Sequence, residues 1–120
     1  MNTNNPIIQL CMEGARAEFE HRLEDARVLY QQAWDARKDN YDACIAAHYV
    51  ARFQDSAEES LRWNQIALDH ANAVKDERVK DFYPSLYLSL GRSYELVGNP
   101  SEAQKYYELA AELGVIHQPD

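Results

Sequence analysis

The chain has 120 residues, of which 46% are hydrophobic and 27% are charged, a balance typical of one folded domain with a single core. Its formal net charge of −8 opposes long-range attraction to nucleic acid or to an anionic membrane. No apolar run reaches the roughly 18 residues of a membrane-spanning helix, and the first residues lack the basic and apolar regions of a signal peptide. We therefore expect a cytoplasmic protein that binds neither nucleic acid nor membrane.

Apolar residues recur at helical spacing, whereas alternating apolar and polar runs are scarce. This pattern predicts an all-α fold of about six antiparallel helices. Residues 1–6 are polar, and we expect them to be a disordered N-terminus. The first helix is predicted from about Pro6 to Glu20 and the second from about Leu23 to Arg37.

A third helix is predicted from about Tyr41 to Phe53. Ser56 and Glu59 have the spacing of a capping box, which opens a fourth helix. The segment Leu68–Phe82 interleaves charged and apolar residues and adds about two helical turns. We expect these residues to lengthen the fourth helix, and an extension at the start of the fifth stays open.

Two further amphipathic helices joined by a tight turn are predicted between Tyr83 and Gly114. Gly98 can end the first of them, Asn99 can cap the second, and Pro100 suits the first position of that helix. Gly91 gives the fifth helix a flat spot on which the sixth can lie closely. Two short amphipathic helices cannot bury their apolar faces alone, so they need neighbours.

A pattern of small and aromatic residues occurs twice in the chain. Gly14 is followed twelve residues later by Ala26-x3-Tyr30-x2-Ala33, and Gly91 is followed twelve residues later by Ala103-x3-Tyr107-x2-Ala110. A step of 34 residues from the first copy reaches His48, Ser60, Asn64 and Ala67, so the middle unit matches weakly. His48 then stands in the place of a glycine, unless the register is off by one and Ala47 is the contact.

The last unit, Tyr87-x2-Leu90-Gly91-x2-Tyr94 followed by Ala103-x3-Tyr107-x2-Ala110, resembles the tetratricopeptide repeat, a helix–turn–helix unit of about 34 residues. The resemblance implies a right-handed superhelix of three repeats over residues 7–114, divided into 7–40, 41–83 and 84–114, with a tail at 115–120. It also implies a non-enzymatic scaffold or adaptor. In this family the first helix of each repeat lines a concave groove that holds an extended peptide or a partner helix.

Carried over residue by residue, the resemblance gives nine groove-lining residues: Ile8, Met12, Ala15, Ile45, Tyr49, Arg52, Ser85, Ser89 and Arg92. Apolar and aromatic groups with two arginines suit a peptide that has an acidic group near an apolar anchor. The alternative for the arginines is solvated surface charge.

One ligand class of the family is not expected here. Members that hold the acidic C-termini of heat-shock chaperones use lysine, asparagine and arginine at five groove places. Those places are occupied here by residues that cannot clamp a carboxylate, namely Cys11, Ala15, Ala46, Ser85 and Ser89.

The alternative working surface is the C-terminal flank. Three repeats leave a thin core, and an uncapped apolar end needs a cover. The flank consists of Tyr106, Leu109, Leu113, Val115 and Ile116. A second copy of the chain or another subunit would pair with it, which makes a homodimer the second hypothesis.

The sequence shows no enzyme motif: no phosphate-binding glycine loop, no nucleophile elbow and no His-Glu-x-x-His. The four histidines are scattered at positions 21, 48, 70 and 117, so we expect neither a metal nor a cofactor. Cys11 and Cys44 lack metal-ligand spacing and a redox-pair motif. We expect them to be reduced and to pack as small apolar side chains.

Overall fold

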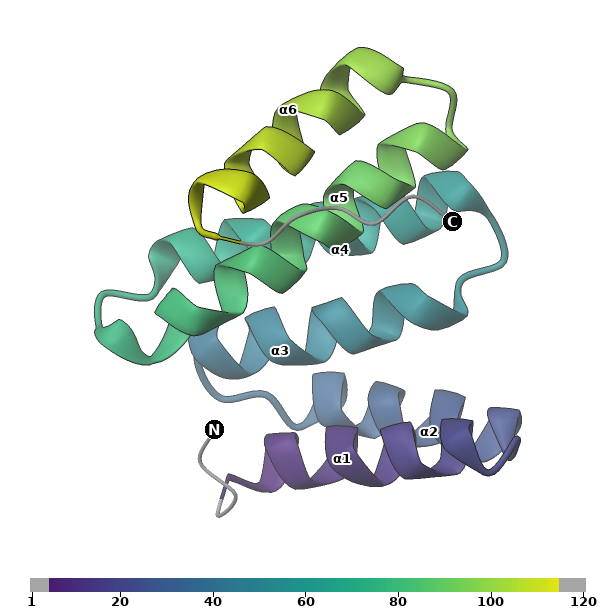
Figure 1. Cartoon of the computed structure of the whole chain (residues 1–120). Coiled ribbons are helices and arrows are strands. Elements are labelled where there is room, and N and C mark those ends of the chain that lie inside the picture. Colours follow the sequence, from purple (N-terminus) through teal and green to yellow (C-terminus); the bar gives the residue numbers. More distant parts are fainter. Residues whose placement is uncertain (1–4, 115–120) are drawn as a thin grey trace.

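The computed structural model describes residues 5–114 of the chain, and this part contains helices but no β-strand. The predicted all-α class is confirmed, with six α-helices and two short 3₁₀ helices in the described residues (Figure 1). In chain order the elements are α1 (Pro6–Phe19), α2 (Leu23–Asp35), α3 (Asn40–Val50), η1 (Ala51–Phe53), α4 (Ala57–Ala73), η2 (Glu77–Phe82), α5 (Tyr83–Leu96) and α6 (Pro100–Glu112).

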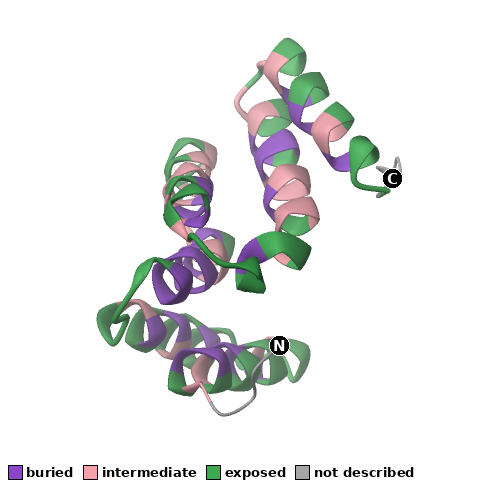
Figure 2. Cartoon of the chain, turned by 90° about the vertical axis from the view of Figure 1, so that its left-hand side faces the viewer, coloured by how far each residue is buried: buried purple, intermediate pink, exposed green. Residues whose placement is uncertain are grey.

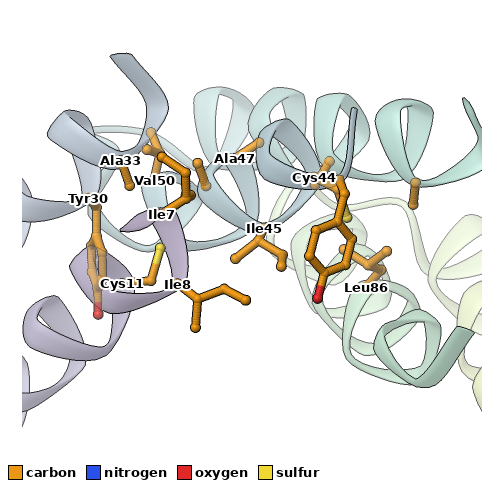
Figure 3. Close-up of a cluster of buried hydrophobic side chains, with 14 of the residues drawn as sticks. Ile7, Ile8, Cys11, Tyr30, Ala33, Cys44, Ile45, Ala47, Val50 and Leu86 are labelled. Atoms are coloured by element: carbon orange, nitrogen blue, oxygen red, sulfur yellow. The ribbon is translucent and has the colours of Figure 1, made fainter. Parts of the chain in front are cut away.

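The helices are stacked in chain order, with the α1–α2 pair at one end and α6 at the other (Figure 1). The core is centred on α3, which packs against α1, α2 and α4. Every residue of α3 from Tyr41 to Ala47 is buried (Figure 2). Ile45 of α3 lies between Ile8 of α1 and Leu86 of α5, so one layer of aliphatic side chains connects the first and third helix pairs (Figure 3).

The predicted helix ends are confirmed where the sequence carries a capping signal. The Ser56 hydroxyl accepts a hydrogen bond from the backbone N–H of Glu59 at 3.1 Å, and the Asn99 side chain accepts one from the N–H of Glu102 at 3.2 Å. Gly98, with φ of +84°, stops α5 in the left-handed conformation that glycine adopts without strain. At the N-terminus, the side chain of Asn5 caps α1 through the N–H of Ile7 at 2.8 Å.

The segment Leu68–Phe82 lengthens the fourth helix as expected, but only over its first residues. At 17 residues α4 is the longest of the described helices, but it ends at Ala73 and does not continue through the segment. Asp76 lies in extended conformation, and its carboxylate accepts a hydrogen bond from the backbone N–H of Arg78 at 2.9 Å. An acidic side chain that caps in this way begins a new helical element. The extra residues therefore form the 3₁₀ helix η2, which buries Val79 and leads directly into α5.

The two strong copies of the small–aromatic pattern have the same construction. A Cβ atom added to Gly14 would lie 2.7 Å from Cδ1 of Tyr30, and one added to Gly91 would lie 2.7 Å from Cδ1 of Tyr107. The Tyr30 hydroxyl donates to Glu18 at 2.8 Å, four residues after Gly14. Likewise the Tyr107 hydroxyl donates to Glu95, four residues after Gly91. Each ring thus lies on a glycine and is held by a carboxylate one turn further along the same helix.

Candidate functional site

The structure separates the nine predicted groove residues into buried and accessible ones. Ile8 and Ile45 are almost fully buried, so their assignment to a ligand-facing surface is wrong. The physical reason is that the neighbouring helices enclose α3, so that Ile45 packs in the core together with Ile8. Met12, Ala15, Arg52, Ser85 and Arg92 are exposed, whereas Tyr49 and Ser89 are partly buried.

A first pocket lies between α1 and α3 and has a volume of about 370 Å³. We call it the α1–α3 pocket; it is lined by Ala15, Glu18, Phe19, Tyr30, Tyr49 and Arg52. Its floor is aromatic, because the Tyr30 and Tyr49 rings are stacked with centroids 5.1 Å apart. Phe19 at its rim is 87% exposed.

Arg52 is not a freely solvated charge. Its guanidinium holds Glu18 with two hydrogen bonds, from Nε at 2.9 Å and from a terminal nitrogen at 2.5 Å. The hydrogen bond from Arg52 lowers the pKa of Glu18, and the bond from Tyr30 adds to this against the opposing effect of burial. The pair joins α1 to the chain just after α3, so Arg52 has a structural partner in addition to any ligand.

A second pocket adjoins the first at Arg52 and has a volume of about 150 Å³. We call it the middle pocket; it is lined by His48, Ala51, Arg52, Ser60, Asn64, Ser89, Arg92, Ser93 and Leu96. No carboxylate is among these residues, and two are arginines. This is a locally positive site in a protein whose formal net charge is −8.

The middle pocket exists because the middle unit departs from the small–aromatic pattern. The first and third units fill this place with a tyrosine ring on a glycine. At the corresponding positions the middle unit has Asn64 and His48, and both line the pocket. Asn64 is too short to fill the space of a tyrosine, and it donates instead to the Ser93 hydroxyl at 2.8 Å. Asn64 and Ser93 are 5% and 4% exposed, so this hydrogen bond crosses the interior between α4 and α5.

His48 is the least satisfied polar group of the site. Its Nδ1 is buried and has no hydrogen-bond partner in the described part of the chain, although its ring packs edge-on against Tyr49 and Phe82. Burial, together with the charge of Arg52, lowers the pKa of His48 to about 4. The imidazole is therefore neutral at pH 7. Ala47, the alternative contact residue, is fully buried in the core.

Arg92 differs from the other arginines. Six of them form ion pairs with carboxylates: Arg16, Arg22, Arg27, Arg52, Arg62 and Arg78. Arg37 donates to the carbonyl oxygen of Trp34 and lies over its ring. Arg92 alone among the arginines has no hydrogen bond, ion pair or ring contact within residues 5–114. Arg92 is exposed and lines the middle pocket.

The predicted self-association flank is only partly accessible. Tyr106 is buried, and its ring is stacked on Tyr94 with centroids 5.6 Å apart, so its assignment to an exposed flank is wrong. Leu109 is half-buried, whereas Leu113 is 52% exposed. Val115 and Ile116 lie outside the described residues.

Sequence reasoning missed two contributors to these pockets, Phe19 and Asn64. No sequence signal separates Phe19 from the apolar residues that pack on the first helix, and only the structure shows that its side chain is 87% exposed. For Asn64 a signal was present, since the step of 34 residues from Tyr30 reaches it. An asparagine in the place of a large ring predicts a vacancy.

The remaining candidate chemistry has a structural explanation. Cys11 and Cys44 are free and buried, and burial raises the pKa of each thiol to about 12, so they pack as apolar groups. No group of three or more histidine, cysteine, aspartate or glutamate side chains in the described ranges could hold a metal ion. None of the described helices is long and apolar enough to cross a membrane.

We compared the chain with protein-family models, with curated proteins and with solved structures, and found no match. The functional argument therefore depends on the two pockets and on the surface that joins them.

Proposed function

We propose that this chain is a tetratricopeptide-like binding module, a small adaptor that holds a segment of a partner protein against the face formed by α1, α3 and α5. One observation carries the proposal: the aromatic α1–α3 pocket and the positive middle pocket both include Arg52. The two pockets therefore adjoin at Arg52, with Phe19 lining the aromatic pocket and Arg92 lining the positive one. A peptide with an apolar anchor followed by an acidic group matches this order.

Binding, rather than catalysis, is the activity that these two pockets suit. Three serines line the middle pocket together with His48, but in the described structure no serine is hydrogen-bonded to the imidazole. Nucleophilic catalysis by serine needs an adjacent base that takes its proton. The serines and the asparagine instead supply hydrogen-bonding groups that orient a bound segment.

The test is selection of binders from a displayed peptide library, followed by calorimetry with the enriched peptides. We expect enriched sequences to combine an apolar residue with an acidic one. Phe19→Ala and Arg92→Glu should each weaken binding by about tenfold, the effect of losing one good contact of about 1.4 kcal/mol. Arg62→Glu is the matched control, because Arg62 is exposed on α4 and does not line either pocket. Peptides that bind both pocket variants as tightly as the wild type would exclude this face as the binding site.

Self-association through the C-terminal end is the second candidate. The exposed Leu113 on the last helix favours it, because a large exposed apolar side chain at the end of a helical stack gains from a cover. Sedimentation over a wide concentration range tests it. A strict monomer at high concentration would refute it, whereas a dimer that Leu113→Glu dissociates would support it.

A further inference from the structure

We propose that the middle pocket is a binding site for a small oxyanion, a carboxylate or a phosphate group. This inference deepens the proposed function, because it names the group that a bound partner segment would place between α3 and α5. It rests on the proposed function for the source of the anion. It makes a separate claim as well: the pocket should bind the free anion when no partner is present.

The charges around the pocket favour an anion. Arg52 and Arg92 both line it, and no acidic side chain does. Glu18 compensates part of the charge of Arg52 from the neighbouring pocket, but no carboxylate compensates Arg92 in the described part of the chain. Guanidinium groups have five N–H donors in a planar fork that matches carboxylate and phosphate oxygens. A cation at this place would be repelled.

The hydrogen-bonding groups of the pocket are short of acceptors. The Ser93 hydroxyl accepts from Asn64, which leaves its own hydrogen to donate elsewhere. The buried Nδ1 of His48 has no partner among residues 5–114, and a buried polar group without a partner is costly. An oxyanion carries several lone pairs and no hydrogens, so it can accept from the Ser93 hydroxyl and, in the tautomer of the neutral imidazole that carries its proton on Nδ1, from His48 as well. An apolar group in the same place would leave them unsatisfied.

The size of the pocket sets the size of the ligand group. Its volume is about 150 Å³. This is room for one carboxylate or phosphate group with its nearest waters. It is well below the roughly 300–1,000 Å³ of pockets that enclose whole drug-sized ligands. The pocket therefore suits one functional group of a larger ligand.

The experiment is a titration of the full chain with sodium phosphate and, separately, with sodium acetate. Sodium chloride keeps the ionic strength constant, and the signals of the histidine rings and arginine Nε groups are followed by NMR. We expect saturable shifts for His48 and Arg92. Arg92→Gln should weaken anion binding by about tenfold or more, the effect of losing one charge-assisted hydrogen bond. Arg62→Gln, which changes the net charge equally, should bind as the wild type does. His48→Phe, which keeps an aromatic ring but removes Nδ1, should also weaken binding when it is followed at Arg92.

The two titrations separate the possible sources. Saturation by acetate alone indicates an acidic side chain or a chain terminus, and saturation by phosphate alone indicates a phosphate group. Shifts that rise linearly in both titrations, or that saturate equally in Arg92→Gln, would overturn the inference. If anion binding is absent while peptides still depend on Phe19 and Arg92, this inference fails and the proposed function stands. If anions bind but no peptide is selected, the anion site stands and the proposed function fails.

Discussion

The contact between Gly91 and Tyr107 gives the sharpest test of how the helix pairs pack. A Cβ atom at position 91 would lie 2.5 Å from Cε1 and 2.7 Å from Cδ1 of the Tyr107 ring, closer than such atoms can approach. The ring has little freedom to move away, because its hydroxyl is held by Glu95 on the same helix as Gly91. Gly91→Ala therefore forces a shift of the ring or of α6.

Two effects of opposite sign decide the change in stability. Alanine is favoured over glycine inside a helix by about 1 kcal/mol, whereas overpacking typically costs about 1–3 kcal/mol. We expect Gly91→Ala to lower the free energy of unfolding by about 1 kcal/mol and Gly91→Leu to lower it by roughly 1–3 kcal/mol. In a Tyr107→Ala background the ring is absent, and the same Gly91→Ala change should raise the free energy of unfolding by about 1 kcal/mol. The coupling between the two positions is then about 2 kcal/mol.

Urea unfolding of the four chains of this double-mutant cycle measures the coupling. The only two tryptophans, Trp34 and Trp63, are in edge contact with centroids 4.9 Å apart, so their fluorescence reports unfolding of the α2–α4 interface. Circular dichroism of the helices must give the same midpoints if unfolding is two-state. Ser85→Ala, an exposed change on α5, controls for helix propensity. If Gly91→Ala stabilises the wild-type chain as much as the Tyr107→Ala chain, the close packing of α5 on α6 at Gly91 is refuted.

Three further predictions concern the charged and buried polar groups. His48 has a pKa of about 4 in the folded chain against an ordinary value of 6.5, so between these pH values the unfolded chain binds a proton that the folded chain does not. As the pH falls from 6.5 to 4, the wild type should therefore lose on the order of 3 kcal/mol more of its free energy of unfolding than His48→Phe does. Parallel dependence of the two stabilities on pH, measured by urea unfolding, would contradict this. Arg52→Glu should lower the free energy of unfolding by about 1 kcal/mol or more, because it places a second acid beside Glu18. Arg92→Glu should change it by less than about 0.5 kcal/mol. Equal urea midpoints for the two variants would refute the difference. Asp42 is buried and accepts from the Asn5 side chain at 3.0 Å and from the backbone N–H of Lys38 at 3.1 Å, so Asp42→Ala should cost about 1–3 kcal/mol, and an unchanged thermal midpoint would show that these bonds contribute nothing.

The predictions from sequence succeeded where a local signal dictates local structure. Ser56, Asn99 and Gly98 each have one physical role at a helix end, and each performs it in the structure. The glycine–tyrosine contacts could also be expected, because an invariant spacing of sixteen residues separates Gly14 from Tyr30 and Gly91 from Tyr107. Capping and close packing depend on residues within one helix pair, so a single sequence carries the information.

The predictions were weaker where several helix pairs meet. The family resemblance assigned Ile45 to the groove, but the neighbouring helix pairs bring Ile8 and Leu86 against it. Arg52 looks like free charge in the sequence, and only the fold brings Glu18, 34 residues away, within hydrogen-bond distance. The fate of Leu68–Phe82 was decided by Asp76, whose capping side chain begins a new element in the middle of a helical pattern. Each of these depends on distances between helix pairs, which periodicity along the chain does not determine.

The three departures of the middle unit have one consequence in common. His48 replaces a glycine, Asn64 replaces a tyrosine, and Arg52 stands four residues after His48, where the other units place Glu18 and Glu95. Each change removes one part of the glycine, tyrosine and carboxylate arrangement that the first and third units share. In the middle unit, an amide, an imidazole and a guanidinium stand in place of the tyrosine ring, the glycine and the carboxylate, and these three groups line the middle pocket. The first and third units thus keep the tyrosine–glycine packing, whereas the unit between them has a polar pocket with two arginines in its lining.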